Sequence, residues 1–580
     1  MGLSDAIRSL FGGRGKGSGW VVVLDGEPGP FCDTVGTPLF SPDGTRFAYT
    51  ASSKDRWYVV VDGEPSPEYL GIGNPTFSPD GRRFAYAAGR EGKVTVVVDG
   101  EEGPLYDVLL QGTPVFSPDS RHVAYGVQQA GKWHVVLDGE PGPAYDSVGV
   151  PLFSPDGGRF GYVAMVGDRS VAVVDGQPGR EYELVAGLAF SQDGSRVAYA
   201  AKTGDLCWVV VDGEPEPLDG VDAPFFSPDG RLAYVAARGG KVVMHPDGRG
   251  VRYAADGGGQ VYVVVDDLPG PDCDSVTRPV FSADSTRVAY CASGAGKSRV
   301  VADGALGPGF DRATALTFSP AGSRLAYAAG EGDKLVTVVD GERVTYVGLG
   351  EAKWFVVLDG QRGPDFDELG GMAFSPDGER FAYVGGSGRK WMVVADGQVG
   401  PDHDEIFVGR PLFSPDGTHL AYAARADQKW MVVLDGEPGP EYQGILGLVF
   451  SPDGRRVAYS ALQPDGLVVV VDGEPGPTHE SFISDPVFSP DSTHVAYLAG
   501  KGTKQVAVVD GRPGAAYDKI AGLVWSPVGS RLAYLAKTGR GWLAVVDGQA
   551  GPVYDEIAEG SLVFSPDGAR VAYAARRGGQ

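Results

Sequence analysis

The string SGAGKS at residues 293–298 is the nearest approach in this sequence to a phosphate-binding loop. Such a loop needs a glycine five positions before the glycine that precedes its lysine, because the backbone must approach the phosphates closely. Cys291 occupies that position, and the string stands between an Ala-Tyr pair and the next apolar run. We therefore expect a short turn here and no nucleotide site.

Nucleophilic and zinc-dependent catalysis each need particular residues at particular spacings. The sequence contains no G-x-S-x-G, no H-E-x-x-H and no C-x-x-C, and its four cysteines and seven histidines are scattered. We therefore predict that the protein is not an enzyme and has no catalytic residues, no metal site and no cofactor.

An aspartate recurs in Ser-Pro-Asp turns along the chain, as at Asp43, Asp80, Asp119 and Asp156. A ring of such carboxylates could bind cations, but the alternating oxygen ligands of a calcium loop are missing. Aspartate in a tight turn commonly accepts hydrogen bonds from its own backbone. We expect these residues to cap turns.

The turns belong to a repeat that runs through almost the whole chain. One copy reads KWMVVLDGEPGPEYQGILGLVFSPDGRRVAYSA at residues 429–461. Eleven of the thirteen separations between copies are 36 to 39 residues, a spacing close to that of a four-stranded propeller blade. The aromatic residue that precedes the turn marks fourteen copies: Phe40, Phe77, Phe116, Phe153, Phe190, Phe226, Phe281, Phe318, Phe374, Phe413, Phe450, Phe488, Trp525 and Phe564.

Local chemistry predicts four short antiparallel strands in each copy. The run WMVVL is apolar and β-branched, and it stops at Asp-Gly, a dipeptide typical of type I′ hairpin turns. Pro-Asp-Gly supplies a second tight turn. Four-stranded units repeated radially form a β-propeller, so we predict an all-β fold of fourteen four-stranded blade repeats.

The FSPDGxRxAYxA pattern resembles the WD40-like repeat of bacterial TolB-type proteins and of the propeller domains attached to prolyl-oligopeptidase-type peptidases. The resemblance covers residues 20–580. It implies a β-propeller that serves mostly as a protein-binding platform. The chain departs from both relatives, since we expect neither the export signal and extra N-terminal domain of TolB proteins nor a peptidase domain.

Fourteen blades exceed the usual four to eight, so we expect tandem β-propellers. The chain begins with one strand pair of a repeat and ends with the complementary pair, which predicts a closing blade built from both ends. Extra hairpins at residues 241–256 and 334–348 mark possible crossings between rings. We favour six plus eight blades, with a flexible tail at residues 1–19, a first propeller at 20–258 and a second at 259–580; seven plus seven is the alternative.

The charge balance restricts the partners. With 50 basic and 75 acidic residues the net charge is −25, whereas nucleic-acid binding depends on basic residues that neutralise phosphates. No apolar run is long enough to span a membrane, and residues 1–19 lack the apolar core of a signal peptide. We expect an acidic, cytoplasmic protein that binds neither nucleic acid nor, by stable insertion, a membrane.

Two repeated sets of side chains are candidate binding surfaces. The rim glutamates follow the Asp-Gly turns and could steer a partner with a basic surface, although a solvated acidic face would look the same. The register tryptophans stand five residues before the Asp of Asp-Gly; they could form an aromatic belt, or they could fill space between sheets. The rim glutamates are Glu27, Glu64, Glu101, Glu140, Glu214, Glu437 and Glu474, and the register tryptophans are Trp20, Trp57, Trp133, Trp354, Trp391, Trp430 and Trp542.

From these features we predict a non-catalytic scaffold that mediates protein–protein interactions. The alternative is a lectin-like propeller that binds carbohydrate or peptide through its aromatic ring positions.

Overall fold

The computed structural model describes residues 19–246, 251–332, 335–340, 343–407, 411–481 and 483–578. The chain forms fourteen antiparallel sheets, which confirms the all-β prediction. Within the described ranges the remaining regular element is the short 3₁₀ helix η1 (Asp256–Gly258), and no helix there has the length and apolar character needed to cross a membrane. Most of the tail expected at residues 1–19 lies outside the described residues.

Each sheet has between four and seven strands. The first seven sheets are β1 Gly19–Leu24, β2 Glu27–Pro28, β65 Glu556–Ile557, β66 Val563–Phe564 and β67 Val571–Arg577; β3 Thr34–Val35, β4 Leu39–Phe40, β5 Phe47–Ser53, β6 Arg56–Val61 and β7 Glu64–Pro65; β8 Gly71–Phe77, β9 Phe84–Arg90, β10 Lys93–Val98 and β11 Glu101–Glu102; β12 Val108–Leu109, β13 Val115–Phe116, β14 Val123–Gln129, β15 Lys132–Leu137 and β16 Glu140–Pro141; β17 Ser147–Val148, β18 Leu152–Phe153, β19 Phe160–Val166, β20 Arg169–Val174 and β21 Gln177–Tyr182; β22 Leu184–Phe190, β23 Val197–Thr203, β24 Leu206–Val211 and β25 Glu214–Leu218; and β26 Gly220–Val221, β27 Phe225–Phe226, β28 Leu232–Arg238, β31 Gln260–Val265 and β32 Leu268–Pro269.

The other seven sheets follow in chain order. They are β29 Val242–Pro246, β30 Val251–Ala255, β33 Ser275–Thr277, β34 Val280–Phe281, β35 Val288–Gly294, β36 Lys297–Ala302 and β37 Ala305–Leu306; β38 Arg312–Phe318, β39 Leu325–Glu331, β42 Lys353–Leu358 and β43 Gln361–Arg362; β40 Leu335–Asp340, β41 Arg343–Gly348, β44 Glu368–Phe374, β45 Phe381–Ser387, β46 Lys390–Ala395 and β47 Gln398–Val399; β48 Glu405–Ile406, β49 Leu412–Phe413, β50 Leu420–Ala426, β51 Lys429–Leu434 and β52 Glu437–Pro438; β53 Gly444–Phe450, β54 Val457–Gln463, β55 Gly466–Val471 and β56 Glu474–Pro475; β57 Val487–Phe488, β58 Val495–Lys501, β59 Lys504–Val509 and β60 Arg512–Tyr517; and β61 Lys519–Trp525, β62 Leu532–Thr538, β63 Gly541–Val546 and β64 Gln549–Ala550.

The sheet β53–β56 shows why the repeat folds as it does. Asp472 and Gly473 connect β55 to β56 with φ angles of 53° and 84°, the left-handed values that a type I′ turn requires at both positions. Gly454 ends the Ser-Pro-Asp-Gly turn at φ 79°, and its N–H donates to the carbonyl of Ser451 over 2.9 Å. The first five residues of β54 are buried, because neighbouring sheets cover both of its faces. These features confirm the predicted strands and turns.

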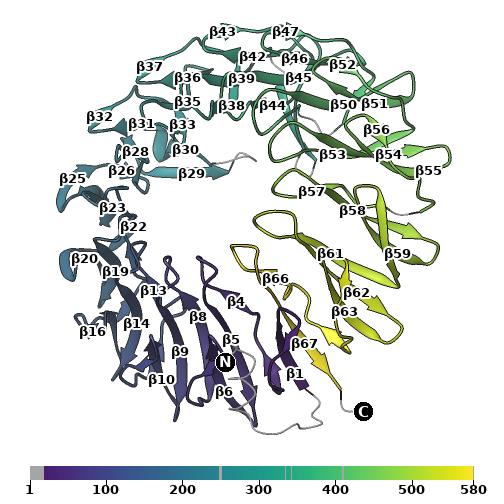
Figure 1. The fold of residues 1–580 in the computed structure, drawn as a ribbon. Helices are drawn as coiled ribbons and strands as arrows, with labels where there is room; N and C mark the ends of the chain where they lie inside the picture. Colours follow the sequence, from purple (N-terminus) through teal and green to yellow (C-terminus); the bar gives the residue numbers. More distant parts are fainter. Residues whose placement is uncertain are drawn as a thin grey trace.

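The sheets stand side by side around one large ring (Figure 1). Their short last strands, such as β16, β25, β32, β43 and β52, lie on the outer circumference of this ring. Small apolar clusters join neighbouring sheets, such as that of Val135 in β15 with Tyr162 in β19. The hydrophobic core is therefore a series of layers between sheets.

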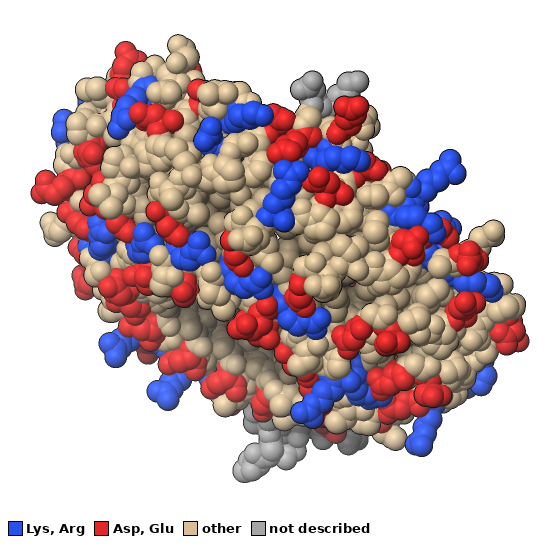
Figure 2. All heavy atoms as spheres, turned by 90° about the horizontal axis from the view of Figure 1, so that it is seen from above, with Lys and Arg blue, Asp and Glu red and all other residues tan. Residues whose placement is uncertain are grey.

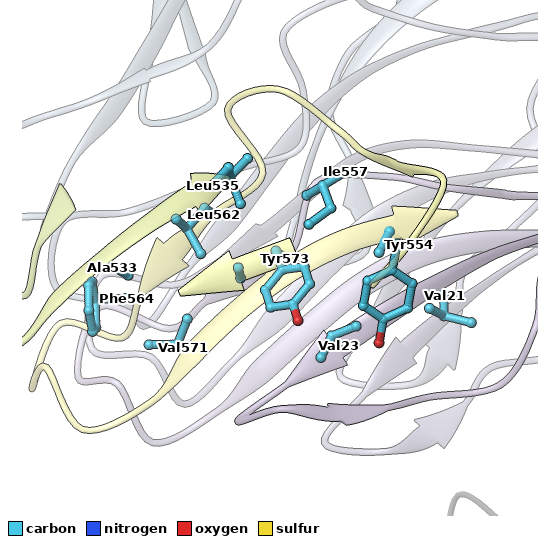
Figure 3. Packing of buried hydrophobic residues seen from close by; sticks show 12 residues of the cluster. Val21, Val23, Ala533, Leu535, Tyr554, Ile557, Leu562, Phe564, Val571 and Tyr573 are labelled. Carbon is cyan, nitrogen blue, oxygen red and sulfur yellow. The ribbon is translucent and has the colours of Figure 1, made fainter. Parts of the chain in front are cut away.

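The two chain ends share one sheet, as the sequence predicts. β1 pairs antiparallel with β67 from Gly19 opposite Arg577 to Leu24 opposite Ala572. Figure 3 shows Val23 of β1 near Tyr573 of β67 and Val21 beside Tyr554, in a cluster that also contains residues of the preceding sheet. This pairing closes the ring without an unpaired strand edge at the junction.

The single ring differs from the expected division into two propellers. The boundary at residue 258 falls inside one sheet, between the paired strands β28 and β31. Contacts also continue into the next sheet, since the guanidinium of Arg231 lies 5.5 Å from the centre of the Phe281 ring. The physical reason is that sheet-to-sheet packing passes this boundary without a break.

The two extra hairpins extend sheets instead of connecting rings. The hairpin of β29 and β30 is inserted in the sequence between β28 and β31, and β30 pairs with β33 of the next sheet. The hairpin of β40 and β41 is inserted in the sequence between β39 and β42, and β41 pairs with β44 of the next sheet. β29 points into the central opening in Figure 1, so this hairpin interrupts the symmetry of the ring on its inner side.

Candidate functional site: notches between neighbouring sheets

In most sheets an arginine side chain reaches towards the next sheet, and Arg46 is an example. Its Nε donates to Asp62 Oδ2 over 2.8 Å within its own sheet. Its Nη1 donates to the carbonyl oxygen of Arg82 in the next sheet over 2.7 Å, and its guanidinium carbon lies 5.5 Å from the centre of the Phe77 ring. The guanidinium thus fastens two sheets together by an ion pair, a charge-assisted hydrogen bond and a cation–π contact.

The same arrangement recurs around the ring, and we call these residues the clamp arginines. Each lies 5.3 to 5.8 Å from the aromatic ring that precedes the next turn. The clamp arginines are Arg46, Arg83, Arg159, Arg196, Arg231, Arg287, Arg324, Arg380, Arg456, Arg531 and Arg570.

Three sheets carry histidine in place of the clamp arginine. The Nδ1 atoms of His122, His419 and His494 each lie 2.6 Å from an aspartate Oδ2, in the position that arginine Nε takes elsewhere. An imidazole is shorter than a guanidinium arm, and its hydrogen bond ends at this aspartate of its own sheet. Beside His419 and His494 a notch lies where the link to the next sheet's carbonyl would be.

The space between two sheets forms a notch on the outer circumference. One wall is the Asp-Gly-Glu-Pro-Gly-Pro hairpin of the first sheet, and the floor includes the Ala-Tyr tyrosine of the next. Gly29 shows how tight this meeting is: a Cβ there would lie 3.2 Å from the Val22 carbonyl oxygen and 3.6 Å from the Tyr49 hydroxyl. Glycine in this hairpin therefore lets the two sheets approach each other.

Two notches beside a histidine are larger than two notches beside a clamp arginine. The notches at Arg570 and Arg456 have volumes of about 220 and 320 Å³, whereas those at His419 and His494 have about 540 and 390 Å³. Phe450 lines the notch at His419, and Trp525 lines that at His494. These are the rings that a clamp arginine would cover, so the histidines uncover an aromatic surface.

The charges of the His419 notch are mostly paired. Asp435 Oδ2 lies 2.6 Å from His419 Nδ1, and Asp435 Oδ1 accepts a hydrogen bond from the backbone N–H of Leu420 over 2.8 Å. Asp472 pairs with Arg456 Nε over 2.9 Å. Glu437 is exposed at the start of β52, so its carboxylate is accessible at the mouth of the notch.

Two further side chains complete the His419 notch. One is the Arg455 side chain. The Ser451 hydroxyl and then the Arg455 backbone N–H lower the pKa of the neighbouring Asp453 carboxyl, and the charge of the Arg455 side chain adds a smaller effect. Tyr459 forms part of the floor, and burial raises the pKa of its phenol. The tyrosine is therefore a neutral hydrogen-bonding group at any ordinary pH.

The Ser-Pro-Asp aspartates act as turn caps. Asp416 accepts hydrogen bonds from the Ser414 hydroxyl over 2.5 Å and from the Thr418 N–H over 3.2 Å, and these bonds lower its pKa to about 2. Among the described residues no group of three or more histidine, cysteine or acidic side chains could hold a metal ion. The SGAGKS string is a hairpin turn between β35 and β36, with Gly294 opposite Lys297.

The rim glutamates are exposed and begin the outermost strands β2, β7, β11, β16, β25, β52 and β56. They are spread around the circumference, one to a sheet. Asp146, which follows Tyr145, lies apart from them, since it pairs with Lys132 at the far end of β15 from Glu140. On the side shown in Figure 2, basic and acidic side chains are intermixed.

The register tryptophans lie at the opposite end of the third strand of each sheet from the rim glutamates. Trp354 is fully buried, and the other six are partly buried. Trp391 packs against the cluster of Ala424 and Met431, which belongs in part to the next sheet. The structure thus places these side chains beside inter-sheet clusters, and the rim glutamates and register tryptophans do not form one site.

The histidine notches were missed by the sequence reasoning, although a signal was present. His122, His419 and His494 stand five residues after the serine of their Ser-Pro-Asp turns, where the other repeats have arginine. A single turn, Ser227 to Arg231, has a spacing of four. Histidine at a position that holds arginine in the other repeats would have marked these three sheets.

Comparison with known proteins gives no family. No family model matches the chain, and no curated protein matches it. Similar solved structures include one described as the eukaryotic initiation factor, with 14% identity, 76% of this chain and 95% of that chain covered, and a TM-score of 0.25. They also include TolB from Acinetobacter baumannii (17% identity, 42% and 64% covered, TM-score 0.20) and the β-propeller domain of the Trilobed protease from Pyrococcus furiosus (13%, 50% and 93%, TM-score 0.22). The ring of antiparallel sheets is itself of the β-propeller type, and these likenesses add no argument about fold or activity.

Proposed function

We propose that this protein is a non-catalytic, WD40-like and TolB-like propeller scaffold that binds a protein partner with a basic surface. One observation carries the proposal: the notches repeat along the outer circumference, and three of them combine an apolar floor with a rim glutamate, namely Glu27, Glu437 or Glu474. A row of such notches suits side chains projecting from an extended or folded partner, with carboxylates to attract its basic groups.

A cytoplasmic location is part of this proposal. All four cysteines are buried and none of them is in a disulfide, as is usual where thiols stay reduced. The lectin-like alternative receives less support, because the register tryptophans lie against inter-sheet clusters.

The test compares two variants with equal loss of charge. In the first, Glu27, Glu437 and Glu474 are changed to Gln. In the second, three exposed acidic residues of turns at the other ends of the strands, Glu91, Asp168 and Asp465, are changed to Gln or Asn. Both variants and the wild type are used to capture partners from a lysate of the source organism at low and moderate salt.

The proposal expects a discrete partner with a basic surface that the wild type and the second variant retain and the first variant loses. Equal retention by both variants would refute the notch surface, because the carboxylates at the notches would then contribute nothing beyond general charge.

A further inference from the structure

We propose that the notch at His419 binds the guanidinium group of an arginine side chain supplied by the protein partner. This inference rests on the proposed function and names the chemical group that the scaffold recognises. It follows from comparing the clamp position that Arg46 fills with the equivalent position at His419, which no arginine fills.

The occupied position shows what a guanidinium contacts in this fold. The clamp arginine Arg46 bonds Asp62, bonds the carbonyl of Arg82 and lies over Phe77. The rim glutamate of the same sheet is Glu64, which begins β7. Among the described residues eleven sheets hold their own arginine over the next sheet's aromatic ring, and nine of these arginines also donate to a backbone carbonyl of the next sheet. The fold therefore forms a guanidinium position at these junctions.

The open position has the same set of groups. At His419 the corresponding residues are Asp435, Arg455, Phe450 and Glu437, and all of them line one notch of about 540 Å³. The imidazole reaches Asp435 and extends no further towards the next sheet. A guanidinium that enters from outside would find an aromatic face, the backbone carbonyl of Arg455 and the exposed carboxylate of Glu437.

The charges at the notch decide which cation fits. Asp435 is engaged by His419, and Asp472 is engaged by Arg456, so Glu437 is the carboxylate most open to an incoming group. The Arg455 side chain also lines the notch and opposes any cation, so the attraction comes from Glu437 and the aromatic face. A planar, weakly hydrated guanidinium can stack on Phe450 and still donate in its plane, whereas an ammonium is a strongly hydrated point charge. The notch therefore favours arginine over lysine.

The His494 notch is a natural comparison. Its aromatic wall is Trp525, but Arg512 begins the outermost strand where Glu437 begins β52. The replacement of a carboxylate by a guanidinium at the mouth would repel an incoming arginine. We expect the His419 notch to bind arginine more tightly than the His494 notch.

The test measures binding of acetyl-arginine methylamide to the full chain by saturation-transfer NMR, with acetyl-lysine methylamide as the comparison ligand. The first variant changes His122, His419 and His494 together to Arg, so that the chain fills its own open positions. The matched variant adds Arg46→His to this triple change, which opens an equivalent position beside Glu64 and Phe77. Thermal unfolding of each variant verifies that it is folded.

We expect saturable binding of the arginine probe to the wild type, at least about fivefold weaker binding of the lysine probe, loss of binding in the triple variant and its return in the matched variant. A single His419→Arg change should remove more binding than a single His494→Arg change. The inference is overturned if the wild type does not bind the arginine probe, if the triple variant binds it as the wild type does, or if lysine binds equally well. Such a failure leaves the result with the rim-glutamate variants unaffected, so the two proposals are tested separately.

Discussion

The pairing of β1 with β67 predicts a local and measurable consequence of weakening β1. Val23 is 0% exposed and packs in the cluster of Tyr573 and Val571. Val23→Ala removes two methyl groups, at about 0.8 kcal/mol each, and leaves a small cavity, so the cost is about 2 kcal/mol. Because chain ends, and not a loop, meet here, the junction can open without unfolding its neighbours. We expect most of this loss of stability to appear as easier local opening of the junction between β1 and β67.

The measurement is hydrogen exchange followed by mass spectrometry of the peptides that contain β1 and β67. A loss of about 2 kcal/mol corresponds to about thirtyfold faster exchange at amides that exchange by this opening. Val97→Ala is the matched control, since Val97 holds the same place before its Asp-Gly turn and is 1% exposed. It should speed exchange in β9 and β10 and leave β67 unchanged. If Val23→Ala leaves the exchange of β67 at the wild-type rate, the ends do not close the ring in this way.

Three further predictions concern the clamp position, which holds arginine or histidine, and two titrating groups. His419→Arg should add a hydrogen bond and a cation–π contact across one junction and stabilise the protein by about 1–2 kcal/mol in chemical denaturation, and Arg46→His should cost a similar amount; opposite signs would contradict the clamp. The pKa of Asp416 is about 2, below its unfolded value, so its contribution to stability is present above pH about 4 and is lost as the pH falls towards 2; Ser414→Ala should raise this pKa in an NMR titration and flatten the melting temperature over that range. His403 is 5% exposed and burial lowers its pKa, so stability should fall as the pH drops from about 6.5 through that lower pKa, and His403→Phe should remove this dependence from thermal melts.

Local structure was predictable because the residues of each turn determine its conformation. Asp-Gly and Pro-Asp-Gly specify their φ angles within two or three residues, and the alternation of the strands between them identifies what is buried. The join of β1 to β67 could also be expected, since the chain begins and ends with complementary halves of one repeat. None of these inferences needs knowledge of how one sheet lies against the next.

The arrangement of the sheets needs that knowledge. The number of sheets in a ring depends on the angle between neighbours, which side chains such as Arg231 and Phe281 determine together across a junction. No local pattern encodes this angle, and the usual number of blades was a poor substitute for it. The extra hairpins were visible in the sequence, but their pairing with β33 and β44 of the following sheets was not.

The candidate site lies between these two cases, because repetition makes a rare substitution informative only when the role of the common residue is known. A histidine in place of arginine is apparent from the sequence at His419, yet its meaning depends on the guanidinium of Arg46 crossing to Arg82 and Phe77 in an equivalent junction. Where that crossing is lost, the fold keeps the carbonyl and the aromatic ring that would receive it, and the carboxylate of Glu437 lines the same notch. A repeat protein can therefore gain a binding site by losing an internal contact, and a partner's arginine can then supply the contact that the chain no longer makes for itself.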